Sequence, residues 1–341
     1  MAQAKVTIKD LAQKLDLSVS TISRALSDHP SIGQKTKTKV KDLAKELGYF
    51  PNSIASNLRK RKTRTVGVIV PRIDVFFHSS VISGIEEIAY AADYSVTIFQ
   101  SKESLEREIE ITNNLQENMV AGIIACISMD TETCEHFDKF GKFKVPVVFY
   151  DRSNKNWKGS KVIIDDYSAA YEATEHLISI GSKKIAHIAG NQKMNIFRNR
   201  LDGYRDALIH NGLEVNEKLI AFTENLSYDE GTDAAKEFLK LEVIPDALFC
   251  ANDSTAISAI QTFKKANLEV PNDIAVVGFS NYPISRIIDP VLTTINDRAF
   301  EMGTTAAKLL IRHIEEANEV ISSETIVLKT DLIKRDSTTK F

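Results

Sequence analysis

The sequence has little of what marks several large classes of protein. Its 341 residues include three cysteines, Cys126, Cys134 and Cys250, whose spacing matches no metal site, so we predict buried or incidental thiols in a reducing compartment. No apolar run approaches the roughly 18 residues that a membrane helix needs, and residues 1–11 lack the apolar stretch of a secretion signal. We therefore expect a cytoplasmic protein that neither spans a membrane nor depends on disulfides.

Signatures of catalysis are missing as well. The chain contains no P-loop, no dinucleotide-binding glycine motif, no nucleophile elbow and no His-Glu-x-x-His zinc motif. Its seven histidines show no metal spacing, and His176 and His187 fall on predicted core elements. Adjacent carboxylates such as Asp165 and Asp166 are common in loops. The sequence thus predicts no enzymatic activity, no cofactor and no bound metal.

A surplus of basic residues, the usual mark of a nucleic-acid binder, is absent from the chain as a whole, whose formal charge is −3. The average hides an asymmetry. Residues 1–64 contain 14 Lys and Arg against 5 Asp and Glu, a charge of +9, whereas the remaining residues contain 29 against 41, a charge of −12. A basic head on an acidic body indicates that the head meets a polyanion. Repulsion between the body and DNA would confine contact to the head.

The head is predicted to be helical. Thr7, with an aspartate three residues later, has the spacing of a capping box and begins a first helix. After a turn at Asp16, Ser18 can cap a second helix over residues 19–26. A third helix over residues 34–47 carries five lysines outward. Two short helices joined by a tight turn, with a third packed across them, form the helix-turn-helix pattern.

The exposed side of the second helix carries the polar chemistry of this head. Ser20, Thr21 and Ser23 place short hydroxyl side chains there, and hydroxyls suit phosphate oxygens and base edges. Arg24 can donate two hydrogen bonds to a guanine in the major groove. Periodicity alone leaves a second interpretation open, a small helical bundle with a solvated polar face.

The segment after the third helix favours DNA binding. Residues 51–58 begin with proline and carry an apolar stripe at Ile54, Ala55 and Leu58, directly before four basic residues that start at Arg59. A helix this short is marginal on its own, so we predict that it folds on DNA. Leu58 would be an apolar wedge in the minor groove, with Arg59 beside it. The alternative is a flexible basic linker.

The chain resembles the lactose-repressor (LacI/GalR) family of bacterial transcription regulators. The likeness is carried by Val6-Thr-Ile-Lys-Asp-Leu-Ala12, Ser18-Val-Ser-Thr-Ile-Ser-Arg-Ala-Leu26 and Leu47-Gly-Tyr-Phe-Pro-Asn52, followed by Ile54, Ala55 and Leu58. It extends through the body and so covers essentially the whole chain. One departure is Asp16, because the family usually has glycine in that turn.

The resemblance assigns roles to residues of the head. It implies that base edges in the major groove are read by Val19, Ser20 and Arg24. It implies that phosphates are contacted by Thr7, Ser18, Thr21, Ser23, Thr36, Tyr49 and Asn52. The hinge contributes Ala55, Leu58 and Arg59, with Leu58 at the residue that intercalates at the centre of the operator.

The body alternates short apolar runs with helical patterns. Strands are predicted over residues 66–70, 96–99, 121–127, 145–150, 162–164, 185–189, 247–251 and 274–279, with a short one at Phe222. Helices are predicted over residues 79–92, 105–119, 168–180, 198–211, 229–239, 254–266 and 297–317. This alternation implies parallel sheets covered by helices on both faces. Ligands of such sheets bind beyond the carboxyl ends of the strands.

Polar and aromatic side chains stand at those strand ends. The candidates are Arg72, Asp74, Phe76, Phe77, Asp151, Arg152, Asp165, Asp166, Asn252, Asp253, Ser280 and Asn281, with Arg198 and Arg200 at the start of a helix. Aromatic faces with amide, carboxylate and guanidinium groups suit a small polyhydroxylated or planar polar ligand. Loop or capping roles stay open for each carboxylate, and core or dimer-interface roles for Phe76 and Phe77.

The bodies of the resembling family look like periplasmic sugar-binding proteins, in which two lobes joined by three crossovers hold an effector between them. The positions that the resemblance places at the effector are Phe76, Phe77, Asp151, Arg200, Leu226, Asn252 and Ser280. Arg200 matches the effector-binding arginine, and the two phenylalanines match the aromatic positions of purine-responsive members. Two departures concern the ligand. Ser280 stands where many members use an aspartate for sugar hydroxyls, and Leu226 where many have a stacking aromatic residue.

We therefore predict an all-α helix-turn-helix head with a hinge helix, joined to an α/β two-lobe domain like a periplasmic binding protein. The head is placed at residues 1–50, and the hinge helix and basic linker at residues 51–63. The effector-binding and dimerisation domain is placed at residues 64–341, with crossovers near residues 165, 292 and 325.

We predict a sequence-specific transcriptional regulator and favour a repressor. It would bind a palindromic DNA operator as a homodimer, because one head reads only a half-site, and respond to a small effector, a carbohydrate or related metabolite. No leucine heptads follow residue 331, so we expect no tetramerising tail. The alternative is a small-molecule binding protein whose basic head is only a tether. The sequence leaves open which effector binds and whether it induces or corepresses.

Overall fold

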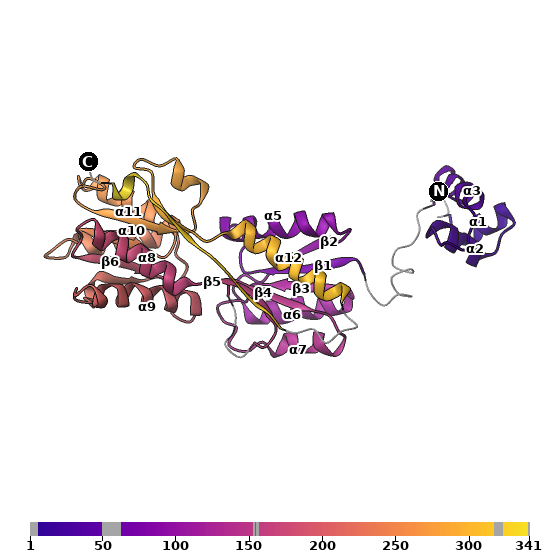
Figure 1. Cartoon of the computed structure of the whole chain (residues 1–341), viewed down its shortest axis with the longest axis horizontal. Helices are drawn as coiled ribbons and strands as arrows, with labels where there is room; N and C mark the ends of the chain where they lie inside the picture. Colours follow the sequence, from indigo (N-terminus) through magenta and orange to yellow (C-terminus); the bar gives the residue numbers. More distant parts are fainter. Residues whose placement is uncertain (1–5, 50–62, 153, 155–156, 317–322, 340–341) are drawn as a thin grey trace. The chain divides into compact units, whose positions relative to one another are not determined.

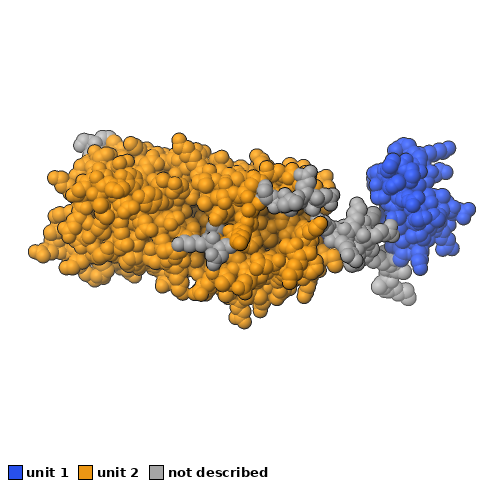
Figure 2. Space-filling view, turned by 60° about the horizontal axis from the view of Figure 1, so that its bottom comes forward, with its two compact units in different colours: residues 1–63 blue, residues 64–341 orange. Residues whose placement is uncertain are grey.

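A computed structural model describes residues 6–49, 63–152, 154, 157–316 and 323–339. The chain forms two compact units, a head that ends at Thr63 and a body that begins at Arg64 (Figure 2). The predicted hinge helix and basic linker, residues 51–63, lie outside the described residues except for Thr63.

The described part of the head contains three helices, α1 (Ile8–Leu15), α2 (Val19–Leu26) and α3 (Gln34–Glu46). The carboxylate of Asp10 accepts hydrogen bonds from the N–H and hydroxyl of Thr7 at 2.7 and 2.8 Å. The hydroxyl of Ser18 accepts the N–H of Thr21 at 3.1 Å and so caps α2. Between the two helices Asp16 adopts the left-handed conformation with φ 50°, so aspartate here takes the backbone shape that glycine adopts most easily.

One small core holds the head together. Its buried residues are Leu11, Ala12, Ile22, Ala25, Val40 and Ala44. They come from all three helices, and each repeats at the spacing of one helix face. The same spacing leaves the opposite face of α2 in solvent, where its polar residues stand.

The body has two lobes, each built on a six-stranded sheet (Figure 1). The strands of lobe 1, in sheet order, are β11 (Thr325–Leu328), β5 (Ser160–Ile164), β4 (Val147–Tyr150), β3 (Gly122–Ala125), β1 (Thr65–Val70) and β2 (Ser95–Gln100). The strands of lobe 2 are β12 (Asp331–Ile333), β10 (Thr293–Asn296), β9 (Ala275–Phe279), β8 (Ala247–Cys250), β6 (Ile185–Ala189) and β7 (Ile220–Phe222). Among the described strands, β12 alone runs antiparallel to its neighbour.

Helices cover both faces of each sheet, as the alternating pattern predicts. Lobe 1 carries α5 (Phe76–Ala91), α6 (Leu105–Glu117), α7 (Glu135–Lys142) and α12 (Ala299–Glu315). Lobe 2 carries α8 (Asp166–Ser179), α9 (Asn195–His210), α10 (Tyr228–Leu239) and α11 (Asp253–Lys265). The helices pack in pairs, α5 with α12, α6 with α7, α8 with α9, and α10 with α11. Short 3₁₀ helices add η1 (Glu217–Leu219), η2 (Pro283–Arg286) and η3 (Asp336–Thr338).

The chain crosses between the lobes three times (Figure 1). The crossings lie at residue 165, at residues 297–298 and at residues 329–330. The second and third come a few residues after the positions expected from the sequence. The reason is that β10 continues in lobe 2 to Asn296 and β11 continues in lobe 1 to Leu328.

Two glycines allow α5 and α12 to meet backbone to backbone. A Cβ atom on Gly303 would lie 2.1 Å from the carbonyl oxygen of Val81, and one on Gly84 would lie 2.3 Å from that of Phe300. We expect Gly303→Ala to lower the free energy of unfolding by about 1–3 kcal/mol, because two backbones must move apart. Urea unfolding measures this change.

Gly141→Ala in α7 is the matched control. No described atom lies within 4 Å of the added methyl group, so the better helix propensity of alanine should act alone and raise stability by up to about 1 kcal/mol. Equal stability of Gly303→Ala and the unchanged chain would show that the helices separate without cost.

Candidate functional site

The head presents one polar face of α2 to solvent. Ser18, Ser20 and Arg24 are exposed, and Val19 is 43% exposed although it is apolar. The hydroxyl of Ser18 lies 2.8 Å from the hydroxyls of both Ser20 and Thr21. The side chain of Arg24 forms no ion pair or hydrogen bond with the described residues. This face therefore offers one free guanidinium beside a row of hydroxyls.

The predicted DNA contacts fall into two groups. The described ones are Thr7, Ser18, Val19, Ser20, Thr21, Ser23, Arg24, Thr36 and Tyr49, each exposed or half-buried on the head. The others, Asn52, Ala55, Leu58 and Arg59, lie outside the described residues. The α2 face groups most of the first set, and Thr36 and Tyr49 stand near the two ends of α3.

The body contains a cavity of about 390 Å³ between its lobes. Lobe 1 lines it with Arg72, Asp74, Phe76, Phe77, His78, Glu103, Met129, Asp151 and Arg152, and lobe 2 with Phe197, Arg200, Leu226, Tyr228, Asn252, Ser280 and Tyr282, among others. Asp297, on the second crossing, completes the lining. The structure thus places all seven predicted effector residues around one cavity at the carboxyl ends of the strands.

Arg200 is the most constrained side chain of this cavity. It is 5% exposed, and its Nε donates to Asp166 at 2.8 Å while its Nη1 donates to the carbonyl of Ala251 at 2.7 Å. Its guanidinium lies 3.6 Å from the ring centre of Phe279, within range of a cation–π interaction. Partners on three elements hold the group in one orientation at the cavity wall.

Two further arginines of the cavity are held by carboxylates of their own lobe. Arg72 donates to both oxygens of Asp74 at 3.0 and 2.6 Å. Arg152 donates from Nη1 to both oxygens of Glu103 at 3.0 and 2.8 Å. Glu103 also accepts the N–H of Met129 at 2.9 Å, so one carboxylate ties together the loops that follow β2, β3 and β4.

Three buried carboxylates lie in or beside the cavity: Asp151 and Asp297 line it, and Asp166 is paired with Arg200. Burial raises the pKa of Asp166 to about 7, although the neighbouring Arg200 opposes the shift. Burial also raises the pKa of Asp297 to about 7, against a hydrogen bond from Ser280. Burial raises the pKa of Asp151 as well. These groups therefore hold protons more tightly than free carboxylates do, because desolvation penalises their charged form.

Aromatic rings line the cavity from both lobes. The ring centres of Phe76, in lobe 1, and Tyr282, in lobe 2, lie 5.5 Å apart in an edge-to-face arrangement. Phe77 is 8% exposed and packs near Tyr150. Leu226, 5% exposed, offers no aromatic face, whereas Phe197 and Tyr228 add two further rings to the lining from lobe 2.

Asn252 has a structural task in addition to its place in the lining. Its side-chain oxygen accepts the N–H of Thr255 at 2.9 Å and so caps α11. Its Nδ2 donates to the carbonyl of Leu226 at 2.8 Å. The amide therefore orders two loops of the cavity wall, which also fixes its own orientation.

Among the lining residues that sequence reasoning missed are Glu103, Tyr282 and Asp297. Glu103 follows a strand that the sequence predicts, so the rule that selected the other strand ends could have found it. Tyr282 lies two residues after Ser280 and carried no separate signal. Asp297 follows β10. This strand was not predicted because three of its four residues, 293–296, are polar.

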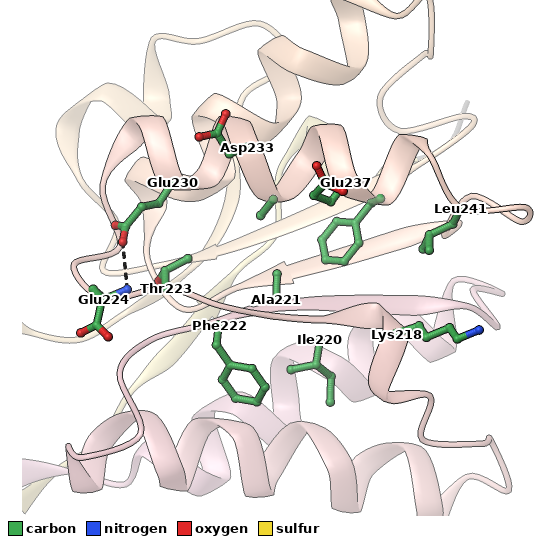
Figure 3. A pocket seen from close by; sticks show the side chains of 12 residues that line it. Lys218, Ile220, Ala221, Phe222, Thr223, Glu224, Glu230, Asp233, Glu237 and Leu241 are labelled. Carbon is green, nitrogen blue, oxygen red and sulfur yellow. Dashed lines mark hydrogen bonds between the residues drawn. The ribbon is translucent and has the colours of Figure 1, made fainter.

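A second, larger hollow of about 540 Å³ lies between β7 and α10 (Figure 3). Its rim carries Lys218, Asp233 and Glu237, and Glu230 there accepts the N–H of Glu224 at 2.9 Å within the cap of α10. None of the predicted effector residues lines it, and no arginine does. Volume alone therefore does not identify the ligand site, whereas convergent polar and aromatic groups favour the interlobe cavity.

The described ranges contain neither a candidate metal site nor a membrane-spanning helix. No group of three or more histidine, cysteine, aspartate or glutamate side chains within them could hold a metal ion. No helix among the described residues has both the length and the apolar character needed to cross a membrane.

Two families match the two units of the chain. Residues 7–52 match the bacterial regulatory proteins of the lacI family, and residues 63–336 match the periplasmic binding proteins and sugar binding domain of the LacI family. Catabolite control protein A of Priestia megaterium is 32% identical over 334 residues, 98% of this chain and 99% of that protein. The HTH-type transcriptional regulator RegA of Clostridium saccharobutylicum is 31% identical over 334 residues, 97% of this chain and 99% of that protein.

Solved structures of two transcriptional regulators match nearly the whole chain. The lac repressor dimer bound to operator and the anti-inducer ONPF matches with a TM-score of 0.88 and 25% identity, over 99% of this chain and 100% of that chain. The complex of transcriptional regulator CelR with cellobiose matches with a TM-score of 0.74 and 28% identity, over 97% and 99%. The predicted fold class and regulatory function are confirmed, and the plain helical bundle and the tethered binding protein are excluded. This chain, with its helix-turn-helix head and two-lobe body, belongs to the LacI family of bacterial transcriptional regulators.

Proposed function

We propose that this chain is a cytoplasmic repressor that binds a palindromic operator as a homodimer, responds to a small polar effector, and catalyses no reaction. The observation that carries the proposal is one cavity whose polar and aromatic groups come from both lobes of a body joined to a DNA-binding head. A ligand that contacts both lobes favours one of their relative positions. The lobes are thus the two-state element through which an effector changes operator affinity.

The proposed domain boundaries are those expected from the sequence. Residues 1–50 bind DNA, residues 51–63 form the hinge, and residues 64–341 bind the effector and dimerise. Bases are read by Val19, Ser20 and Arg24. Phosphates are contacted by the remaining predicted residues of the head, and the minor groove receives Leu58 with Ala55 and Arg59 beside it.

The effector is a carbohydrate or a related metabolite. Carboxylates, guanidinium groups and an edge-to-face aromatic pair line its cavity, and such a mixture suits a hydroxylated ligand with one apolar face. The complex of the related CelR with cellobiose supports this class. Arg200, Asn252 and Asp151 are its proposed polar contacts, and Phe76, Phe77, Leu226 and Ser280 complete the site.

A second copy of this chain is the proposed occupant of its exposed apolar surface. Ile98 is 41% exposed on β2, the edge strand of lobe 1. Ile284 and Ile287, beside η2 in lobe 2, are 51% and 80% exposed. The related lac repressor is a dimer on its operator, which supports the proposed pairing of two copies of this chain.

Arg24→Ala tests the DNA-reading role. The operator is first selected from random duplexes with the unchanged protein. We expect Arg24→Ala to cost about 1–3 kcal/mol per half-site on that sequence and to change affinity for unrelated duplexes much less. Fluorescence anisotropy against salt concentration measures both affinities.

Lys39→Ala on α3 is the control for charge alone. It removes one positive charge from the exposed face of the head, so it should weaken binding to all sequences alike. Arg24→Ala would lose its reading role if it, too, weakened all duplexes equally.

A further inference from the structure

The arginines of the interlobe cavity leave no free positive charge for an anionic ligand. Among the described residues, each guanidinium of the lining has a carboxylate at hydrogen-bond distance: Arg72 with Asp74 at 2.6 Å, Arg152 with Glu103 at 2.8 Å, and Arg200 with Asp166 at 2.8 Å. The lining also holds Asp151, Asp297 and Glu224. Its carboxylates therefore outnumber its guanidinium groups, and the cavity carries a net negative charge once Asp151 and Asp297 are ionised.

Two buried carboxylates of this lining have no arginine of the described residues at hydrogen-bond distance. Asp151 lies 3.9 Å from Nε of Arg152, and Asp297 lines the cavity together with Ser280. A ligand hydroxyl donates as well as accepts, so it can donate to either carboxylate. A phosphate or carboxylate group has only acceptors for the same carboxylates and meets like charge.

Asp297 is the second of these carboxylates. It lines the cavity together with Ser280 and is 2% exposed. Asp297 lies on the second crossing between the lobes. A ligand that donates to this carboxylate therefore contacts the segment that joins the lobes.

We propose that Asp297 and Asp151 select an effector that is an uncharged or amine-bearing polyol and reject its phosphorylated and carboxylated forms. Asp297 is the acidic contact at the second crossing between the lobes. The inference rests on the proposed effector site, and it adds the charge class of the ligand and a residue that sets it.

Matched ligand sets test the selection. Full-length protein is titrated by calorimetry with glucose, glucosamine, glucose 6-phosphate and glucuronate, and with the equivalent sets of galactose, mannose and ribose. We expect the binding members to be neutral or aminated, with the anionic member of the same set at least a hundredfold weaker. In titrations at pH 8, where the Asp297 carboxylate is charged, Asp297→Asn should reduce that ratio to less than tenfold, because a neutral amide replaces the charge.

Glu237→Gln is the control, since Glu237 lies at the hollow beside β7 and should leave the ratio unchanged. Tighter binding of a phosphorylated or carboxylated member overturns the inference, as does full discrimination in both Asp297→Asn and Asp151→Asn. In those cases effector-controlled DNA binding would stand. Operator affinity that no bound ligand alters would instead contradict the proposed function.

A ligand-free readout covers the case in which no member of the sets binds. The pKa of Asp297 is raised to about 7 by burial, from an ordinary value of 3.8. Its protonation therefore stabilises the fold fully below about pH 4, and that stability is lost as the pH rises through 7. The charged or titratable neighbours are Asp151, Asp253, Arg200 and Tyr282.

We expect the Tm of the unchanged chain to fall between pH 5 and 8, and Asp297→Asn to remove part of that fall. Asp166 and Asp253, whose pKa values burial also raises to about 7, account for the remainder. An identical pH slope in the variant would show that Asp297 is a solvated carboxylate, and it would overturn the proposed contact.

Discussion

A chain that lacks residues 1–62 should lose all specific operator binding while its body folds and binds the effector as the full chain does. The body is a compact unit with cores of its own, so removal of the head exposes no body core. Residues 1–64 carry the α2 face and a formal charge of +9, whereas residues 65–341 carry −12. Without the head, the protein presents net negative charge to a polyanion.

Two measurements check this result. Fluorescence anisotropy with the selected operator should show no binding of the truncated chain at low salt, where residual electrostatic attraction would be greatest. Circular dichroism and urea unfolding should show that the body is intact. Operator affinity within tenfold of that of the full chain would contradict the assignment of DNA binding to the head.

Arg200→Ala should have the second largest effect. The change leaves the carboxylate of Asp166, 3% exposed, and the carbonyl of Ala251 without their buried partner. Breaking such a buried pair costs about 3–5 kcal/mol. The variant should also fail to change its operator affinity when effector is added, because a polar contact and the order of the cavity wall are both lost.

The controls for Arg200 come from the same position and the same helix. Arg200→Lys keeps the positive charge but not the planar fork, so it should fold more stably than Arg200→Ala and still respond weakly. Arg205→Ala, also on α9, removes a pair with Glu217 whose side chains are 33% and 65% exposed, which should cost less than about 1 kcal/mol. A normal effector response in Arg200→Ala would place the effector outside the interlobe cavity.

The head could be predicted closely from its sequence because its structural signals are local. The capping residues Thr7 and Ser18 stand within three positions of the groups they bind. The predicted second helix coincides with α2, and α3 ends one residue before its predicted end. Each small helix needs only its own spacing and caps to be recognised.

The body could be predicted in its alternation but not in all its strands. β6 coincides with the predicted strand because its apolar run is short and continuous. β10 was not predicted, because Thr293 and Thr294 look like surface residues, yet both are fully buried. Thr293 is hydrogen-bonded to Thr338 and Thr294 to Asp253, partners more than 40 positions away in the chain.

The same distinction separates the site residues that were found from those that were missed. Strands followed by polar residues were enough to select Asp151, Asn252 and Ser280. Asp297 was not selected because β10, the strand that it follows, was not predicted. The resemblance to the family singled out Leu226, since nothing local distinguishes one loop leucine from another. It also assigned the effector role to Arg200, which the sequence pattern had only placed with Arg198 at the start of a helix.

The last two strands of the chain have a consequence for how the protein is made. β11 adds to the edge of the lobe 1 sheet and β12 to the edge of the lobe 2 sheet. During synthesis, therefore, neither lobe can be finished until almost the whole chain has left the ribosome, whereas the three helices of the head are complete by residue 46. A chain cut short before β11 would keep the head that recognises an operator but would lack a complete effector-binding body.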